Sequence, residues 1–428
     1  MTKKQWLLTA AVFHILVTVG VFVLGHYRLA SSVFDEFGTG IAFASDGVTY
    51  RFLAQEISFR WQTYGIGAWL DTQAPLHLRL YMLCFRILGP LLGYNILAAA
   101  PLNALFYVCI LSLVYLLAKE LFDARVGMIA AIVVALWPSF LIHSTQLLRD
   151  PLSIICMLAL VLLLTMLLTR TLSIKQCALV SLAGIATLIV LWLARGNMWN
   201  VIIVFQLITA VLLLVRIVRE RSVNWSVPVL IVFILASLVI PGQIDSMTIG
   251  GLNRPKSPLA ISDSRPRPGN TWQRLIAQLG ARRAGFRVYG PQGSNIDADV
   301  RLDNTGAVIR YLPRATVIGV FAPFPQLWVQ PGKVSRMGRL VSGLETLVMY
   351  FCYAFCLVCL WHERRRVAVW LPVLAAISGM ILLGLVVVNV GALFRLRYIF
   401  WILLIPVGVK GLVITAGSLR ARRSTQSS

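Results

Sequence analysis

Long apolar stretches, each close to twenty residues, most constrain what this chain can fold into. They cover residues 6–25, 96–118, 126–143, 151–169, 176–194, 197–215, 226–241, 341–361, 367–390 and 398–417. A helix needs about 20 residues to cross a hydrocarbon core of about 30 Å. A transmembrane barrel would show short alternating segments instead. We therefore predict an all-α integral membrane protein, a polytopic bundle of about 10 transmembrane helices.

The composition supports the same class and narrows the partners. Of the 428 residues, 58% are hydrophobic and 13% are charged, whereas soluble domains average about 25% charged residues. The net charge is +23, and the basic residues lie between the apolar stretches. Membrane lipids and phosphate-bearing ligands are therefore the expected partners, rather than nucleic acid.

Short basic connections set the expected orientation, because such connections favour the cytoplasmic side. They alternate along the chain and fall at Lys119–Arg125, Arg170–Lys175, Arg216–Arg221, His362–Arg366 and Arg420–Arg423. Both termini are then inside, and the protein is expected to be a multi-pass protein of the cell inner (plasma) membrane. Two larger loop regions, 26–95 and 242–340, become extracytoplasmic.

Three regions follow from this topology. Residues 1–241 form a transmembrane core that includes the acidic first outer loop, 26–95. Residues 242–340 form a basic extracytoplasmic loop, whose segment Tyr311 to Val329 is expected to be re-entrant or interfacial. Residues 341–428 supply the C-terminal transmembrane helices and a cytoplasmic tail.

Two acidic residues are expected on the extracytoplasmic face. Asp46 begins a predicted amphipathic helix in the first outer loop, and Asp150 lies directly before Pro151 at the outer end of a span. Either carboxylate could serve only to cap a helix, since acids favour the positive helix N-terminus. Two acids converging at one interface, however, suit an acid–base or metal-assisted reaction.

Several short motifs resemble the GT-C glycosyltransferases, in the branch with protein O-mannosyltransferases and lipid A aminoarabinose transferases. They are Asp46 with Tyr50, Pro75-Leu76, Leu121-Phe122-Asp123-Ala124-Arg125-Val126-Gly127, Trp137-Pro138 and Leu148-Arg149-Asp150-Pro151, with a weaker match at Arg395-Leu396-Arg397-Tyr398. The resemblance implies a GT-C-like bundle that transfers a sugar from a polyprenyl phosphate donor to an extracytoplasmic lipid, glycan or protein.

The resemblance also implies a catalytic role for Asp46, as general base toward the acceptor. Gly47 stands where the family often has glutamate, so Asp46 is the sole acid of its motif and Asp150 is the candidate partner. Asp35-Glu36 is a literal acidic pair, but it lacks the following tyrosine and ranks second.

A departing polyprenyl phosphate needs cationic stabilisation, and arginine forks match phosphate oxygens. The candidate substrate-binding residues are Tyr50, Arg149, Arg310, Arg314, Arg395, Arg397 and Tyr398. Interfacial anchoring is the alternative for Arg395 and Arg397, and a solvated surface is the alternative for the loop arginines.

No metal ligand is predicted, because His77 and His143 lack a second histidine or cysteine at ligand spacing. The acidic residues could nevertheless hold a divalent cation; no other cofactor is expected.

Two other functions remain open at this point. A polysaccharide polymerase or ligase of the O-antigen type would share the arginine-rich outer loop but lack the acidic first loop. A lipid-linked sugar flippase or transporter would place ionisable residues within its spans. Here the spans are nearly free of charge between their ends, with Glu345 close to a helix boundary.

Overall fold

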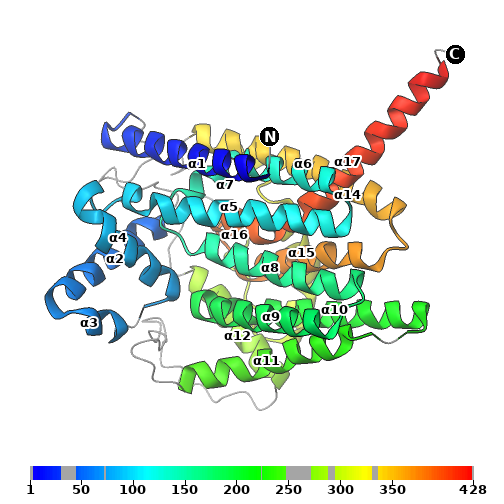
Figure 1. The fold of residues 1–428 in the computed structure, drawn as a ribbon, viewed down its shortest axis with the longest axis horizontal. Helices are drawn as coiled ribbons and strands as arrows, with labels where there is room; N and C mark the ends of the chain where they lie inside the picture. Colours follow the sequence, from blue (N-terminus) through cyan, green and yellow to red (C-terminus); the bar gives the residue numbers. More distant parts are fainter. Residues whose placement is uncertain are drawn as a thin grey trace.

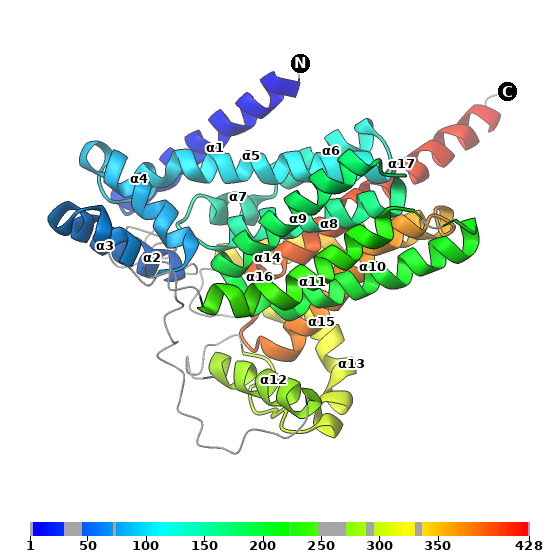
Figure 2. The ribbon, with the colours of Figure 1, turned by 60° about the horizontal axis from the view of Figure 1, so that its bottom comes forward.

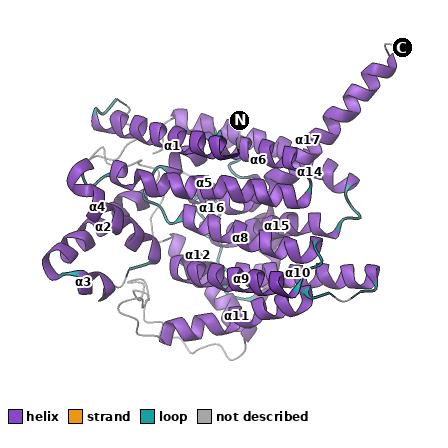
Figure 3. Ribbon diagram, in the orientation of Figure 1, coloured by secondary structure: helices purple, strands orange, loops and turns teal. Residues whose placement is uncertain are grey.

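The computed structural model describes residues 3–29, 45–71, 74–222, 224–246, 271–287, 295–329 and 336–426. These residues are almost entirely helical (Figures 1 and 3). Within them, extended pairing is limited to an isolated bridge between Asn295 and Asn389. The prediction of an all-α membrane protein is confirmed.

The described residues include nine long apolar helices. They are α1 (Lys3–His26), α5 (Ile96–Leu121), α8 (Asp150–Thr169), α9 (Ile174–Arg195), α10 (Trp199–Glu220), α11 (Ser226–Ser246), α14 (Arg336–His362), α15 (Val367–Val386) and α17 (Tyr398–Gln426). By length and composition, the described residues contain eight stretches able to cross a membrane, or nine with a bent pair. One of the eight, residues 174–220, holds both α9 and α10, joined by the 3-10 helix η2 (Gly196–Met198).

The helices α9 and α10 are separate spans because they run in opposite directions. Arg195, at the end of α9, pairs with Asp150 at the start of α8. Arg216, near the end of α10, instead donates to the carbonyl oxygen of Leu167 near the end of α8. The stretch therefore doubles back between these two points.

The bent pair consists of α6 (Ala124–Ala135) and α7 (Pro138–Ser144), which meet at 69°. Proline lacks a backbone N–H and pushes the preceding residue toward an extended conformation. Trp137 has φ −71° and ψ 109°, as expected before Pro138. This break ends α6 and turns α7 toward the outer half of the bundle. Counted as one span, the pair completes the set of predicted spans.

Predicted cytoplasmic connections lie together at one end of the bundle. Arg366 donates to the carbonyl oxygen of Leu121 at 2.6 Å, and Arg219 donates to that of Arg365 at 2.9 Å. Three of the basic connections are thus in contact, as an alternating topology requires.

The centre of the bundle is formed by α5, α8, α15 and α17, whereas α1 is peripheral. Among the 18 most apolar consecutive residues of each helix, 67% are buried in α8 and in α17, but only 17% are buried in α1. The helix α1 is nevertheless tied to α7, because Nε2 of His14 lies 2.9 Å from the hydroxyl of Ser144. Most of its apolar surface faces outward, as expected of a helix in contact with lipid.

Two groups of shorter helices lie outside this bundle (Figure 2). The first outer loop contains α2 (Ser45–Tyr64), α3 (Ile66–Asp71) and α4 (Leu76–Leu92). The helix predicted to start near Asp46 is present as α2, but it is not amphipathic, because its apolar side chains do not gather on one face. The second group contains α12 (Thr271–Arg287), α13 (Thr305–Phe321) and the 3-10 helix η3 (Pro325–Leu327). The short helix α16 (Val390–Leu396) instead lies among the bundle helices, directly before α17. Both α12 and α13 pack against α15. The segment Tyr311 to Val329 thus supplies the second part of α13, which is not among the membrane-length helices.

Candidate active site

The start of α2 packs against the segment that joins α7 to α8. A Cβ atom added to Gly47 would lie 3.6 Å from Cβ of Gln146 and 3.7 Å from the carbonyl oxygen of Leu147. These are ordinary contact distances, so an alanine would fit. A glutamate at this position, as in the resembling family, would need further room against the same segment. The close approach brings Asp46 of the first loop to the start of α8.

Two buried side chains hold this segment in place. The hydroxyl of Tyr81 on α4 donates to Oδ1 of Asn103 at 2.9 Å and lies 3.1 Å from the carbonyl oxygen of Leu148. Nδ2 of Asn103 on α5 donates to the carbonyl oxygen of Thr145 at 2.9 Å. Buried polar groups with fixed partners hold irregular backbone in a single conformation. The network therefore fixes where α8 begins.

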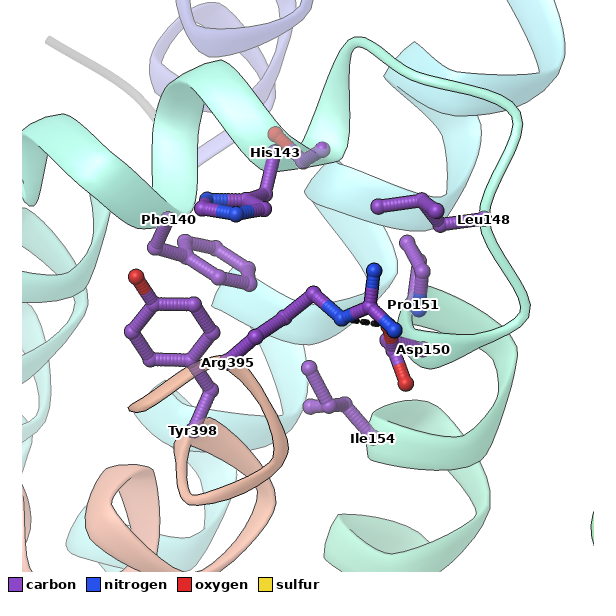
Figure 4. A pocket seen from close by; sticks show the side chains of 9 residues that line it. Phe140, His143, Leu148, Asp150, Pro151, Ile154, Arg395 and Tyr398 are labelled. Atoms are coloured by element: carbon purple, nitrogen blue, oxygen red, sulfur yellow. Dashed lines mark ion pairs between the residues drawn. The ribbon is translucent and has the colours of Figure 1, made fainter. Parts of the chain in front are cut away.

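The helix α8 begins at Asp150, with Pro151 in its first turn, as predicted. The carboxylate of Asp150 does not act only as a cap. Its Oδ1 accepts a hydrogen bond of 2.6 Å from Nη1 of Arg195, and both side chains are almost fully buried. Its Oδ2 lies 3.3 Å from Nε of Arg395 (Figure 4).

Arg395 joins the two acids that the sequence placed on the same face. Its Nη2 donates to Oδ2 of Asp46, while its Nε faces Asp150. The short helix α16 presents it, capped by the side chain of Asn389, which accepts from the amide of Ala392 at 2.9 Å. One guanidinium from near the C-terminal end of the sequence thus bridges α2 and α8, which both lie in its first half.

The charges at this position do not cancel. Burial acts to lower the pKa of Arg395, but Asp150 and Asp46 together raise it above its usual value, so the guanidinium stays charged. Arg149 and Arg195 add two more guanidinium groups near Asp150. Among the described residues, Arg149 forms no ion pair, and its Nε atom is buried without a hydrogen-bond partner. The cluster therefore carries one excess positive charge.

Tyr50 and His77 form the wall of the cluster on the side of the first loop. Their rings meet edge to face, with centroids 4.8 Å apart. Burial raises the pKa of Tyr50. Burial, aided by the charge of Arg149, lowers the pKa of His77 to about 3, so its ring is neutral. Neither ring nitrogen of His77 has a hydrogen-bond partner.

A small pocket lies beside Arg395 (Figure 4). Its walls include Asp150, Arg395, Phe140, His143 and Tyr398. The hydroxyl of Tyr398 is in turn bonded to that of Ser139, which donates to the buried carboxylate of Glu345 on α14. This chain of hydrogen bonds fixes Tyr398 and the bend between α6 and α7.

The remaining predicted residues lie away from the cluster. Arg397 is buried and donates to the carbonyl oxygen of Val320 at 2.9 Å, at the end of α13. Arg314 pairs with Asp297 at 3.1 Å, and Arg310 is exposed on the same helix. The pair Asp35-Glu36 lies outside the described residues.

One outer-loop arginine has a clear structural role. Arg283 on α12 is 1% exposed. It donates to the carbonyl oxygens of Asp297 at 2.6 Å, Leu385 at 2.9 Å and Val300 at 3.0 Å. These contacts join α12 and the segment before α13 to the end of α15.

Sequence reasoning missed Arg195 and undervalued His77. Arg195 interrupts a long apolar stretch at its outer end, opposite the basic connections, and that position was a usable signal. From the sequence, His77 was considered only as a zinc ligand. The possibility that a single buried imidazole acts without a second ligand was not considered.

The acidic residues that could hold a divalent cation are paired with arginines in this structure. Asp46 and Asp150 already face Arg395, and Asp150 also binds Arg195. Within the described ranges no group of three His, Cys, Asp or Glu side chains could hold a metal ion. A dedicated cation site needs several oxygen ligands that are not neutralised by guanidinium groups.

The low pKa of His77 predicts a specific dependence of stability on pH. In the unfolded chain the ring takes up a proton below about pH 6.5, whereas in the folded protein it stays neutral until about pH 3. Stability is therefore lost as the pH falls through this window. At a pH of about 5.5 the loss is about 1.4 kcal/mol. His77→Leu should show a smaller fall in melting temperature between pH 7.5 and 5.5 than the parent protein.

The exposed His26 provides the control, because His26→Leu should leave the fall unchanged. An equal fall in the parent and in His77→Leu would mean that the ring is not buried in its neutral form.

With the site described, the chain can be compared with known proteins. No protein-family model matches it, and no curated protein matches it by sequence. Solved structures of the Archaeoglobus fulgidus oligosaccharyltransferase do match. The apo form gives a TM-score of 0.54 at 17% identity, over 99% of this chain and 52% of the other.

Two further structures of that protein agree. The form tethered to an acceptor peptide with the NVT sequon gives a TM-score of 0.54 at 15% identity, over 99% and 51% of the two chains. The complex with Zn and sulfate gives 0.51 at 17% identity, over 96% and 50%. The chain therefore has the GT-C fold that its motifs implied, and it spans about half the length of the oligosaccharyltransferase.

Proposed function

We propose that this protein is a membrane glycosyltransferase that moves a sugar from a polyprenyl-phosphate-linked donor to an extracytoplasmic acceptor. The single observation that carries the proposal is the bridge of Arg395 between Asp46 and Asp150. It brings the acidic motif of the first loop to the arginine motif before the last helix. The GT-C fold supports this reading, and we place the chain beside the protein O-mannosyltransferases and lipid A aminoarabinose transferases.

The two carboxylates differ in exposure, and this difference divides their roles. The side chain of Asp46 is 41% exposed, and that of Asp150 is 7% exposed. Only Asp46 can reach an incoming acceptor. Asp150 instead holds Arg195 and Arg395 in position.

The reaction then proceeds as a single displacement. The acceptor oxygen attacks the anomeric carbon, and its proton passes to the carboxylate of Asp46. The bond from the anomeric carbon to the phosphate oxygen breaks, and its electron pair stays on the phosphate. A positioned base of this kind contributes about 10²–10⁴-fold in rate.

The excess positive charge suits the leaving group. Arg149 is the guanidinium of the cluster without an ion pair among the described residues, so it can bind the phosphate without displacing a carboxylate. Cationic groups fixed in advance where negative charge develops are among the largest contributions to catalysis.

The flippase alternative is less compatible with these contacts. A translocation path requires ionisable residues along a span. Here Asp150, Arg195 and Arg395 instead form one closed cluster at helix ends. The polymerase or ligase alternative does not account for Asp46 at the start of α2.

The test is transfer by the purified protein in nanodiscs, using a panel of polyprenyl phosphate sugars that includes mannose, glucose, galactose and aminoarabinose. We expect one donor to release polyprenyl phosphate in step with sugar transfer to a membrane-fraction acceptor. Movement of the intact lipid between leaflets, with no donor cleaved, would favour the flippase. Transfer of whole glycan blocks would favour the polymerase or ligase.

A further inference from the structure

His77 is an anomaly among the buried polar groups of this protein. Its side chain is 1% exposed, yet Nδ1 and Nε2 both lack a hydrogen-bond partner. Buried polar groups are almost always paired, because leaving one unpaired is costly. Within the described residues it is the buried histidine with both ring nitrogens unpaired; His14, by comparison, keeps one bond to Ser144.

The surroundings of His77 favour an anion. Arg149 and Arg195 lie near enough for their charges to act on the ring, and Asp150, the acid within the same range, is already bound by two guanidinium groups. The ring nitrogens and Nε of Arg149 are thus unpaired groups in one neighbourhood. A neutral imidazole offers one N–H donor for such a ligand.

The backbone beside His77 also favours an anion. His77 lies in the first turn of α4, a helix of 17 residues whose N-terminus has no side-chain cap. Helix N-termini bind phosphate through their free amides and their partial positive charge. Hydrogen-bond donors suited to an anion are therefore offered by the uncapped N-terminus of α4, the ring of His77 and the guanidinium of Arg149.

We propose that His77 donates a hydrogen bond to the phosphate of the polyprenyl carrier, beside Arg149. This inference rests on the function proposed above and adds a residue of the first outer loop to the phosphate site. A sugar hydroxyl would not use the excess positive charge, so the phosphate is the better partner for this side of the cluster. Tyr50, packed edge-on against the ring, then fixes the orientation of the imidazole.

The experiment measures the affinity of the purified full chain for a short-chain polyprenyl phosphate and for the matching polyprenyl alcohol. We expect the parent protein to prefer the phosphate. His77→Phe should weaken phosphate binding about tenfold, as expected for a lost hydrogen bond to a charged group. Its affinity for the alcohol should not change. His77→Gln keeps a donor and should recover most of the phosphate affinity.

Two further variants separate the outcomes. Arg149→Gln should weaken phosphate binding, and His26→Phe, at an exposed histidine of α1, should not. If Arg149→Gln weakens binding and His77→Phe does not, this inference is wrong and the proposed function stands. If the parent shows no preference for the phosphate, the proposed function itself fails. An equal loss for phosphate and alcohol in His77→Phe would show a purely structural role.

Histidine-labelled parent protein gives a second readout that needs no folded His77→Phe. Its ¹⁵N spectrum should contain one imidazole signal that is missing from His77→Gln. Polyprenyl phosphate should shift that signal, and polyprenyl alcohol should leave it in place. An unshifted signal at saturating polyprenyl phosphate would overturn the proposal.

Discussion

Replacing Asp46 by asparagine is expected to reduce transfer by about 10²–10⁴-fold while the protein inserts and folds normally. Asparagine can still accept a hydrogen bond from Arg395, and Asp150 continues to hold that guanidinium. The amide cannot take up the proton of an acceptor hydroxyl, however. The measurement is single-turnover transfer from a polyprenyl phosphate sugar, with donor binding measured in parallel.

Glu56 offers a matched control on the same helix. Its side chain is 61% exposed and pairs with Arg60 one turn along α2, so Glu56→Gln should transfer at the parent rate. Unchanged turnover in Asp46→Asn would exclude Asp46 as the base. A loss confined to donor binding would mean that its charge serves only to position Arg395.

Replacing Asp150 by asparagine is expected to destabilise the fold as well as abolish activity. The change leaves Arg195 and Arg395 without their buried counter-charge. Removing one partner of a buried ion pair costs about 3–5 kcal/mol. A large fall in melting temperature should therefore accompany the loss of transfer, since Arg395 is no longer held from α8.

The exposed pair of Glu56 and Arg60 calibrates this effect. Their side chains are 61% and 59% exposed, and ion pairs at the surface contribute about 0–1 kcal/mol. Glu56→Gln should therefore change the melting temperature far less than Asp150→Asn. Removing both charges, as Asp150→Asn with Arg195→Gln, should recover part of the loss because the two residues are coupled. If Asp150→Asn melts at the same temperature as the parent protein, the buried pair of Asp150 and Arg195 does not stabilise the fold.

Much of the fold was predictable because membrane helices follow from local composition. Each span is encoded in its own twenty or so residues, and the bend before Pro138 follows from proline alone. The meeting of α13 with α15 was not predictable, because it depends on contacts between distant segments.

The site shows the same division. Topology placed Asp46, Asp150 and Arg395 on one face. It could not show whether Arg395 or Arg397 binds the two acids. These two arginines lie at the junction of α16 and α17 and have different partners: Arg395 binds the two acids, and Arg397 binds the carbonyl group of Val320. Sequence spacing alone gives no information about which side chain faces the acids. Arg195 was missed because its partner lies on a different helix.

The bridge made by Arg395 also has a consequence for biosynthesis. Residues 46 and 395 are 349 positions apart in the chain, so the ribosome completes most of the protein before the two can meet. Until α16 enters its place, the acid of the first loop has no guanidinium opposite it. A half-translated chain already exposed to lipid-linked sugars would lack this contact, so donor cleavage would await the insertion of the final helices.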